Sequence, residues 1–308
     1  MPMNRGQARV VDPVLSRVAL GYANPIYVGR SLFPQVESPA MGARIIKFGK
    51  EAFIKHNMRR APGGRVARIQ YGYSSDPIAL VQDSLEGLVP REWLRDSQQL
   101  PSVQHGERAI NNVMNSMHLS LEIEQAELAM NASNYGVSNK VTLSGTDKWT
   151  DPSSDPGKQI RDYKEVIRKA IGVYPNVLEI PPAAWNALAE HPKLQDRFKY
   201  TSKDSLTVEM AAAYFELNEV VIGQSVYAPD EMSPMQDVWT DAVLAYVPRQ
   251  GQSVDVPSFG YTYVMPEHPM VEEAYFDKAI KSYVYPTEFE RRAYLTGMDA
   301  GFLIQNIV

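Results

Sequence analysis

The stretch from residue 102 to residue 131 constrains the fold more than any other part of the chain, because it predicts one long helix that is apolar on two sides. A first stripe follows the helical period and consists of Ile110, Val113, Met117, Leu121 and Leu128. A second stripe lies roughly opposite and consists of Leu119, Ile123, Ala126 and Met130. At about 1.5 Å per residue such a helix spans roughly 45 Å. We therefore expect a central helix that is packed from both sides.

One acidic residue interrupts this pattern. Glu124 falls inside the first apolar stripe, and a buried carboxylate is costly unless it has a partner. We therefore predict that Glu124 is paired with a cation or lies at an interface, and we take it as a candidate interface residue of the helix.

Residues 43–75 predict a long two-stranded hairpin. The sequence RAPGG at residues 60–64 supplies the proline and glycines of a turn, and the strand after it alternates between apolar and polar residues. Because an isolated hairpin is marginally stable in water, its flanks need a packing partner. The segment carries a single acid, Glu51, and eight cations: Arg44, Lys47, Lys50, Lys55, Arg59, Arg60, Arg65 and Arg68.

This basic hairpin has three interpretations: an arm that binds nucleic acid, an inter-subunit arm that meets acidic surface on a neighbour, or a solvated edge that lysine and arginine keep from aggregating. The net charge of -5 disfavours the first interpretation. The need for a packing partner favours the second. The candidate inter-subunit contacts are Lys50, Lys55, Arg59, Arg60, Arg65 and Arg68.

The first forty residues predict a second arm. Pro13, Pro25, Pro34 and Pro39 interrupt them, so a short helix fits only between Pro13 and Gly21. The apolar residues that follow have little room for a core of their own. We therefore expect this arm to lie on another surface, and we infer that a lone subunit could not stabilise it. From residue 156 onward, helical and strand patterns alternate.

Composition and motifs exclude several functions. The absence of cysteine rules out disulfides, thiolate zinc sites and cysteine nucleophiles. The sequence has no secretory signal, no apolar run long enough to span a membrane, no phosphate-binding loop and no nucleophile elbow. His118 and Glu122 lie four residues apart, but two ligands are too few for a metal, so we favour a hydrogen-bonded surface pair. For Asp147, Asp151 and Asp155 we favour an ordinary solvated loop over a calcium site. We expect no catalytic residue, metal or cofactor.

Several phrases, in this order, resemble the major capsid proteins of tailed bacteriophages, which have the Hong Kong 97 fold. They are VALGYANPIYVGRSLFPQV, PNVLEIPPAAWNALAEHPKLQDRF, EVVIGQSVY, VWTDAVLAYV and DAGFLIQNIV. The resemblance implies an α+β fold in which residues 259–308 return to the sheet of the peripheral domain. It implies these parts: an N-terminal arm at 1–42, an extended β-hairpin loop at 43–85, a peripheral domain at 86–173 and 258–308 with a spine helix at 102–131, and an α/β axial domain at 174–257.

The same resemblance implies a structural protein that self-assembles as hexamers and pentamers into an icosahedral phage head around double-stranded DNA. The implied partners are further copies of the chain, a separate scaffolding protein, a portal protein at one vertex and, in addition, a decoration protein. The DNA would be packaged without sequence-specific binding, and the head would assemble in the host cytoplasm and become part of the virion. Two alternatives stay open: an encapsulin-like shell that encloses cargo, and a hydrolase with an unrecognised carboxylate site.

Overall fold

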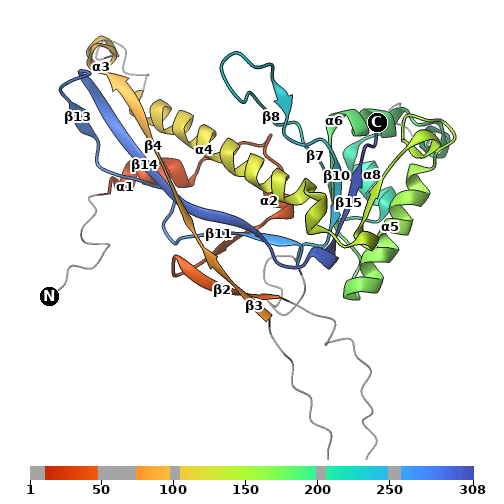
Figure 1. Ribbon diagram of the computed structural model, residues 1–308. Coiled ribbons are helices and arrows are strands. Elements are labelled where there is room, and N and C mark those ends of the chain that lie inside the picture. The colour runs from red at the N-terminus through yellow and green to blue at the C-terminus, as the bar shows by residue number, and fades with distance from the viewer. Residues whose placement is uncertain (1–10, 48–73, 98–104, 199–205, 249–257) are drawn as a thin grey trace, which may run out of the picture.

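The computed structural model describes residues 11–47, 74–97, 105–198, 206–248 and 258–308. Helices and strands are mixed, in two main sheets with a long helix between them (Figure 1). The α+β class predicted from the sequence is confirmed. None of the helices in these ranges is both long and apolar enough to cross a membrane.

The first sheet has six strands and is built around the long strand β14 (Ser282–Leu295). Its other strands are β1 (Gln35–Glu37), β4 (Val81–Pro90), β11 (Gly260–Val264), β12 (Met270–Val271) and β13 (Tyr275–Asp277). Strand β4 pairs antiparallel with β14 over its whole length. The two strands form a long ribbon that ends at helix α3 (Arg91–Ser97) (Figure 1).

The second sheet has five strands in the order β5-β15-β10-β6-β7. Their bounds are Lys140–Thr142, Gly301–Gln305, Ala242–Ala245, Val177–Ile180 and Glu219–Ile222. Helices α5 (Pro156–Ile171), α6 (Pro182–Glu190), α7 (Pro192–Phe198) and α8 (Val208–Phe215) belong to this half of the molecule (Figure 1). A small projecting hairpin joins β8 (Val226–Tyr227) to β9 (Gln236–Asp237).

Two expectations about this sheet need correction. The segment 301–305 does not return to the first sheet, because β15 pairs with β10 and β5. Its side chains from Phe302 to Ile304 are buried there. The segment 134–158, whose polar and turn-forming residues predict a loop, is not loop throughout, since it contributes the edge strand β5 and short 3-10 turns at Val137–Asn139 and Gly145–Asp147. The division of the chain into arm, loop and two domains stays a prediction.

Helix α4 (His105–Met130) is the predicted central helix, and its existence and position are confirmed. It runs along the β4–β14 ribbon and its second half lies beside β10 (Figure 1). Most of the first apolar stripe is buried, and Leu119, Ile123 and Met130 of the second stripe pack against the core with partial exposure. The sequence pattern did not indicate that Glu122 and Gln125 are also buried.

The N-terminal arm folds onto its own subunit, so the inference that a lone subunit could not stabilise it is wrong for the described residues. Helix α1 (Pro13–Leu20), capped by Asp12, packs on α4 and β12. Helix α2 (Gly29–Leu32) packs on α4, and β1 pairs with β11. Leu32 and Phe33 are completely buried. The apolar residues of the arm therefore complete the core of the subunit itself.

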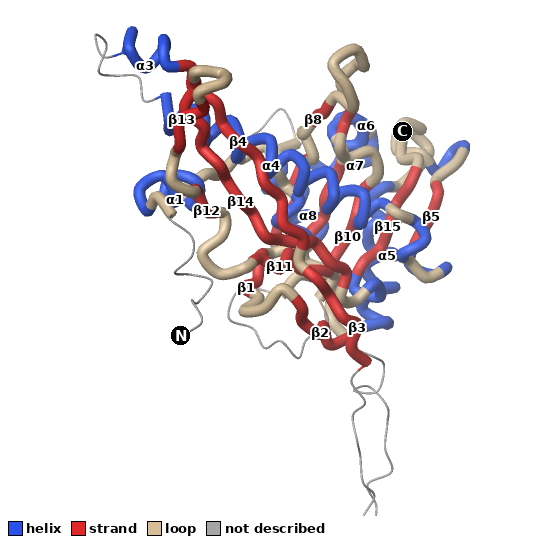
Figure 2. The backbone as a smooth tube through the Cα atoms, turned by 60° about the vertical axis from the view of Figure 1, so that its left-hand side comes forward, coloured by secondary structure: helices blue, strands red, loops and turns tan. Residues whose placement is uncertain are grey.

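The root of the predicted hairpin is present. Strand β2 (Gly42–Lys47) pairs antiparallel with β3 (Ser74–Ala79), at the edge of the structure beside β11 (Figure 2). The rest of the hairpin, residues 48–73, lies outside the described residues. Strand β3 leads directly into β4, so the hairpin is continuous with the ribbon that packs on α4.

Candidate assembly site

The candidate inter-subunit residues Lys50, Lys55, Arg59, Arg60, Arg65 and Arg68 all lie outside the described residues, so their role stays a prediction. What the structure describes is the base from which their segment departs. There the backbone N–H of Leu80 donates to the backbone oxygen of Met41 at 2.8 Å, within the usual range for an amide–carbonyl hydrogen bond. Arg292 donates to the backbone oxygen of Ala79 at 3.3 Å.

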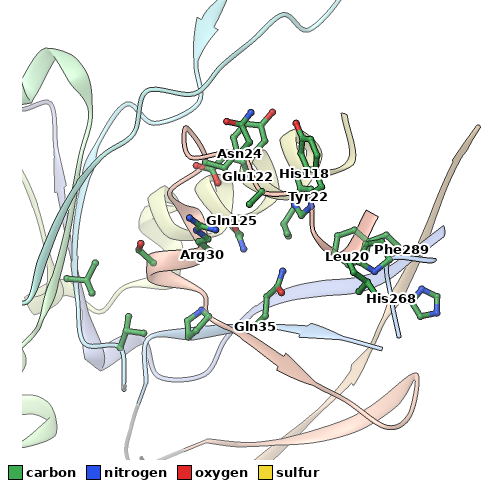
Figure 3. A pocket seen from close by; sticks show the side chains of 18 of the residues that line it. Leu20, Tyr22, Asn24, Arg30, Gln35, His118, Glu122, Gln125, His268 and Phe289 are labelled. Carbon is green, nitrogen blue, oxygen red and sulfur yellow. The ribbon is translucent and has the colours of Figure 1, made fainter. Parts of the chain in front are cut away.

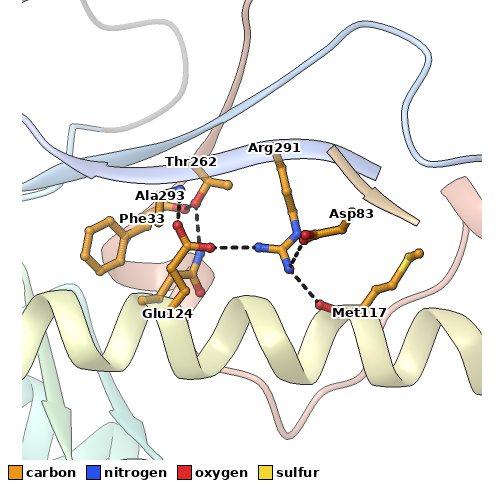
Figure 4. A network of polar contacts seen from close by, with 8 residues as sticks. Phe33, Asp83, Met117, Glu124, Thr262, Arg291 and Ala293 are labelled. Carbon is orange, nitrogen blue, oxygen red and sulfur yellow. Dashed lines mark hydrogen bonds and ion pairs between the residues drawn. The ribbon is translucent and has the colours of Figure 1, made fainter. Parts of the chain in front are cut away.

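Beneath this root, Glu124 belongs to a network that we call the Arg291 ion-pair network: Arg291, Glu124 and Asp83 (Figure 4). The Arg291 guanidinium lies 3.1 Å from the Glu124 carboxylate and 3.0 Å from that of Asp83. It also donates to the backbone oxygen of Met117 at 3.1 Å. The second Glu124 oxygen accepts from the backbone N–H of Ala293 at 3.2 Å.

This network joins three elements through one buried cation. Arg291 lies on β14, Glu124 on α4 and Asp83 on β4, the strand that continues from the hairpin. The Arg291 side chain is 1% exposed, whereas Glu124 and Asp83 are 37% and 40% exposed. Burial lowers the pKa of Arg291 and the two carboxylates oppose that shift, but a guanidinium stays charged in proteins. The prediction that a cation pairs with Glu124 is thus confirmed, while its place at an interface between subunits stays a prediction.

On the same helix, Glu122 holds the N-terminal arm. Its two oxygens accept from the backbone N–H groups of Val28 and Gly29, each at 2.9 Å. The indole nitrogen of Trp239 also donates to it, at 2.7 Å. A Cβ on Gly29 would lie 2.8 Å from Glu122 and 2.1 Å from Gln125, so only glycine lets the arm approach this closely.

A second buried acid lies in the sheet next to this contact. Glu179 on β6 is 0% exposed, and neither of its carboxylate oxygens has a hydrogen-bond partner among the described residues. Burial raises the pKa of Glu179 well above its ordinary value, and the nearby Glu122 and Asp241 raise it further. Sequence analysis predicts a short buried strand at NVLEI but did not single out this residue, because no motif or spacing links the one acid of the strand to a partner.

The expected surface pair of His118 and Glu122 is wrong. The His118 ring lies between Tyr22 and Phe289, with centroid distances of 5.7 Å to each. Burial, with smaller effects of Arg291 and Arg30, lowers the pKa of His118 to about 4. Glu122 is turned to the arm, and no group of three His, Cys, Asp or Glu side chains in the described ranges could hold a metal ion.

The three regularly spaced aspartates have local structural roles. Asp155 caps α5 by accepting from the N–H of Lys158 at 2.9 Å. Asp151 accepts from the backbone and hydroxyl of Ser153 at 2.8 and 2.6 Å, which lowers its pKa. The Asp147 backbone oxygen accepts from Gln159 at 3.0 Å. These contacts are those of turns and a helix cap, as the favoured interpretation of an ordinary loop implies.

A cavity of about 810 Å³ is lined by residues of the arm, of α4 and of both sheets. Its wall includes Tyr22 and Arg30 of the arm, Glu122 and Gln125 of α4, and His268 before β12 (Figure 3). The lining mixes amide, imidazole, carboxylate and aromatic groups from elements far apart in the chain. The contact between Glu122 and the arm therefore lies at the wall of this cavity.

Several exposed apolar side chains lie along the β4–β14 ribbon and at its α3 and β13 end. They are Val81, Leu85, Leu88, Trp93, Tyr275, Ile280 and Tyr283. Two methionines of the β8–β9 hairpin are also exposed, Met232 at 99% and Met235 at 72%. Exposed apolar side chains of this kind are typical of surfaces that contact another protein.

Comparison with known proteins identifies the family. A family model described as phage major capsid protein E matches residues 127–248. The major capsid protein of Burkholderia phage BcepMu is 36% identical over 305 residues, which is 97% of each chain. A crystal structure of a phage-related protein from Bordetella bronchiseptica is 42% identical, covers 98% of each chain and has a TM-score of 0.84.

More distant structures show the fold alone. The SrpI encapsulin of Synechococcus elongatus is 12% identical, with a TM-score of 0.51 over 97% of this chain and 96% of its own. Solved phage capsids share the arrangement at similar identity. The Hong Kong 97-like fold expected from the order of the sequence phrases is therefore confirmed. With the BcepMu protein matched along almost its entire length, this chain belongs to the family of phage major capsid proteins.

Proposed function

We propose that this protein is the subunit of a tailed-phage head, assembled as hexamers and pentamers into an icosahedral shell around double-stranded DNA. The observation that carries the proposal is the 36% identity to a phage major capsid protein over 97% of the chain. The role is structural and needs no catalytic residue, and the protein is a component of the virion that assembles in the host cytoplasm.

The exposed apolar ribbon supports self-assembly. Leu85, Leu88 and Trp93 are each more than two-fifths exposed, and covering such side chains in a closed shell removes apolar surface from water. Each contact can be weak, because a shell joins every subunit to several neighbours. A separate scaffolding protein, a portal protein at one vertex and a decoration protein complete the proposed set of partners, and the DNA is held without sequence-specific contacts.

Electron microscopy and light scattering of the purified full-length chain test this function. We expect hexamers, pentamers or closed shells, formed alone or with a scaffolding protein. A protein that stays a compact monomer under all these conditions contradicts the proposal and favours the hydrolase alternative. Shells isolated from cells with a defined protein cargo in place of genomic DNA favour the encapsulin-like alternative.

We also propose that the basic hairpin contacts a neighbouring subunit. Its eight cations against one acid favour a partner surface of opposite charge, and its root is joined to the ribbon on α4. Replacement of Arg59, Arg60 and Arg65 by Glu should abolish shell formation while thermal unfolding of the subunit stays unchanged.

The matched control replaces the same three arginines by Lys, which keeps the charge and should allow assembly. Normal shells from the Glu variant would show that these cations make no inter-subunit contact. Normal empty shells that fail only to package DNA would instead favour the nucleic-acid interpretation.

A further inference from the structure

The strongest unexplained feature of the molecule is the pair of buried acids Glu122 and Glu179, which we call the acid pair. Glu179 lies in a row of cross-strand neighbours, with Val243 on one side and Val221 on the other. Between these apolar neighbours, a leucine would pack at least as well as a glutamate. With both oxygens buried and without a hydrogen-bond donor among the described residues, an ionised Glu179 would be strongly disfavoured.

Trp239 and Gly223 bring the two acids together. The indole nitrogen of Trp239 donates to Glu122, and a Cβ on Gly223 would lie 2.5 Å from the Trp239 ring and 2.6 Å from Oε1 of Glu179. The Glu179 carboxylate therefore lies against the same indole that binds Glu122. Each acid raises the energy of the other's charged form, because few water molecules screen them.

In the part of the chain that the structure describes, the titratable groups next to the acid pair are acids and phenols. Glu179 faces Glu122 from α4, Asp241 before β10 and the Tyr135 hydroxyl after α4. Glu122 faces Tyr27 of the arm, and Arg30 of the arm is exposed on the wall of the cavity that Glu122 also lines. The pair thus differs from an ordinary buried salt bridge.

We propose that the acid pair is a proton-dependent latch, which holds the Val28 and Gly29 segment of the N-terminal arm against α4 and the five-stranded sheet while at least one of the two carboxyl groups is protonated, and releases that segment when both are ionised. In the closed latch, Glu122 accepts the N–H groups of Val28 and Gly29 beside a neutral Glu179. When both carboxyl groups are ionised, their mutual repulsion and the cost of burying two charges weaken the contact of Glu122 with the backbone of Val28 and Gly29. Water reaches it through the cavity that the arm covers (Figure 3).

The direction of the pH effect follows from the two carboxyl groups. Burial raises the pKa of Glu122, and more strongly that of Glu179, above the ordinary value of a glutamate. A group whose pKa is raised in the docked state stabilises that state at low pH, and this contribution is lost as the pH rises through the raised pKa. The latch therefore opens toward alkaline pH. The proposal concerns docking of the arm and does not depend on the proposed hairpin contact.

Hydrogen exchange of the full-length protein, followed by mass spectrometry, tests the latch. The readout is the protection of a peptide that contains Val28 and Gly29, corrected for the intrinsic pH dependence of exchange. In the wild type we expect protection to fall by about tenfold or more between roughly pH 5 and pH 9. A peptide from α5 should keep its protection over this range and serves as the internal reference.

Variants assign the effect to Glu179. Glu179→Gln and, as an apolar substitute of similar length, Glu179→Met cannot ionise, so the arm should stay protected at alkaline pH. Glu127→Gln removes an exposed carboxylate from the same helix and should respond to pH as the wild type does. The proposal is overturned by protection that does not change with pH in the wild type, or by a Glu179 variant that folds and loses protection over the same pH range.

Discussion

Two clusters of buried ionisable groups include a glutamate of α4, and they differ in how the buried group is compensated. In the Arg291 ion-pair network, a cation that is 1% exposed lies between two carboxylates that reach solvent. In the acid pair, two carboxyl groups are buried together, and Glu179 has no donor among the described residues. The first cluster is charged at every pH at which its acids are ionised. The second is neutral or singly charged only while it keeps a proton.

This difference matches the elements that each cluster joins. The Arg291 network ties β4, and with it the root of the basic hairpin, to β14 and α4. The acid pair lies under the N-terminal arm, which is held by two backbone hydrogen bonds to a side chain. The contact made by Arg291 keeps its cation, because a guanidinium stays charged in proteins. An unpaired buried acid gives a joint whose strength changes when it gains or loses a proton.

The largest effect is expected from Arg291→Met, which removes the cation and leaves Glu124 and Asp83 facing each other. Removal of one partner from a buried ion pair is strongly destabilising, but both carboxylates here can be solvated, so we expect a loss of about 2–3 kcal/mol in the free energy of unfolding. Urea titration of the subunit measures it. Arg292→Met, at the exposed neighbouring position, is the control and should cost less than about 1 kcal/mol. Equal losses would mean that the buried network has no special role.

An intermediate effect is expected from Gly223→Ala, which forces a methyl group between Trp239 and Glu179. Overpacking of this kind costs about 1–3 kcal/mol, and it should also weaken the protection of Val28 and Gly29, since Trp239 is displaced from Glu122. Gly136→Ala is the matched control, because a Cβ there meets nothing within 4 Å. If thermal unfolding and arm protection are the same in both variants, the acid pair is less tightly packed than its distances indicate.

A smaller effect, of opposite sign to that of the acid pair, is expected from His118→Phe. The pKa of His118 is about 4 in the folded chain and about 6.5 when unfolded, so the unfolded chain binds the proton first as the pH falls. The wild type should therefore lose about 1–2 kcal/mol of stability between about pH 7 and pH 5 through this residue. Phenylalanine keeps the contact with Tyr22 and Phe289 but cannot titrate. Unfolding curves at both pH values should show a smaller acid loss in the variant, and identical losses would mean that the ring is accessible to protons when folded.

Local sequence patterns were sufficient to predict the elements that have a strong hydrophobic periodicity or a clear signal for a helix end or a turn. The long helix appears within three residues of its predicted start and one of its predicted end. Helix α5 begins at Pro156, where the alternating helical and strand patterns are predicted to start, and ends before Gly172, which has the left-handed conformation that glycine accepts easily. The hairpin could be predicted at its root because the two strands flank a turn sequence in the same short segment.

The same reasoning failed where the partner of a residue lies far away in the chain. The arm was expected to need another surface, and its partners α4 and β11 are 90 to 230 residues away, on the same subunit. Glu124 could be recognised as a misfit from the helical period, but Arg291 could not be named as its partner, 167 residues later. Glu122 was assigned to the helix surface because an acid next to an apolar stripe usually faces solvent.

By itself, the sequence determined the long central helix, the root of the predicted hairpin, the mixed α+β class and the resemblance to phage capsid proteins, because periodicity, turn residues and the order of phrases are properties of nearby residues. Only the tertiary structure decided that the arm completes its own core, that β15 joins the second sheet, and that two acids lie buried together beneath the arm. These outcomes depend on which distant segments approach one another. Burial and the pKa shifts that follow from it arise from that approach and leave no local pattern in the sequence.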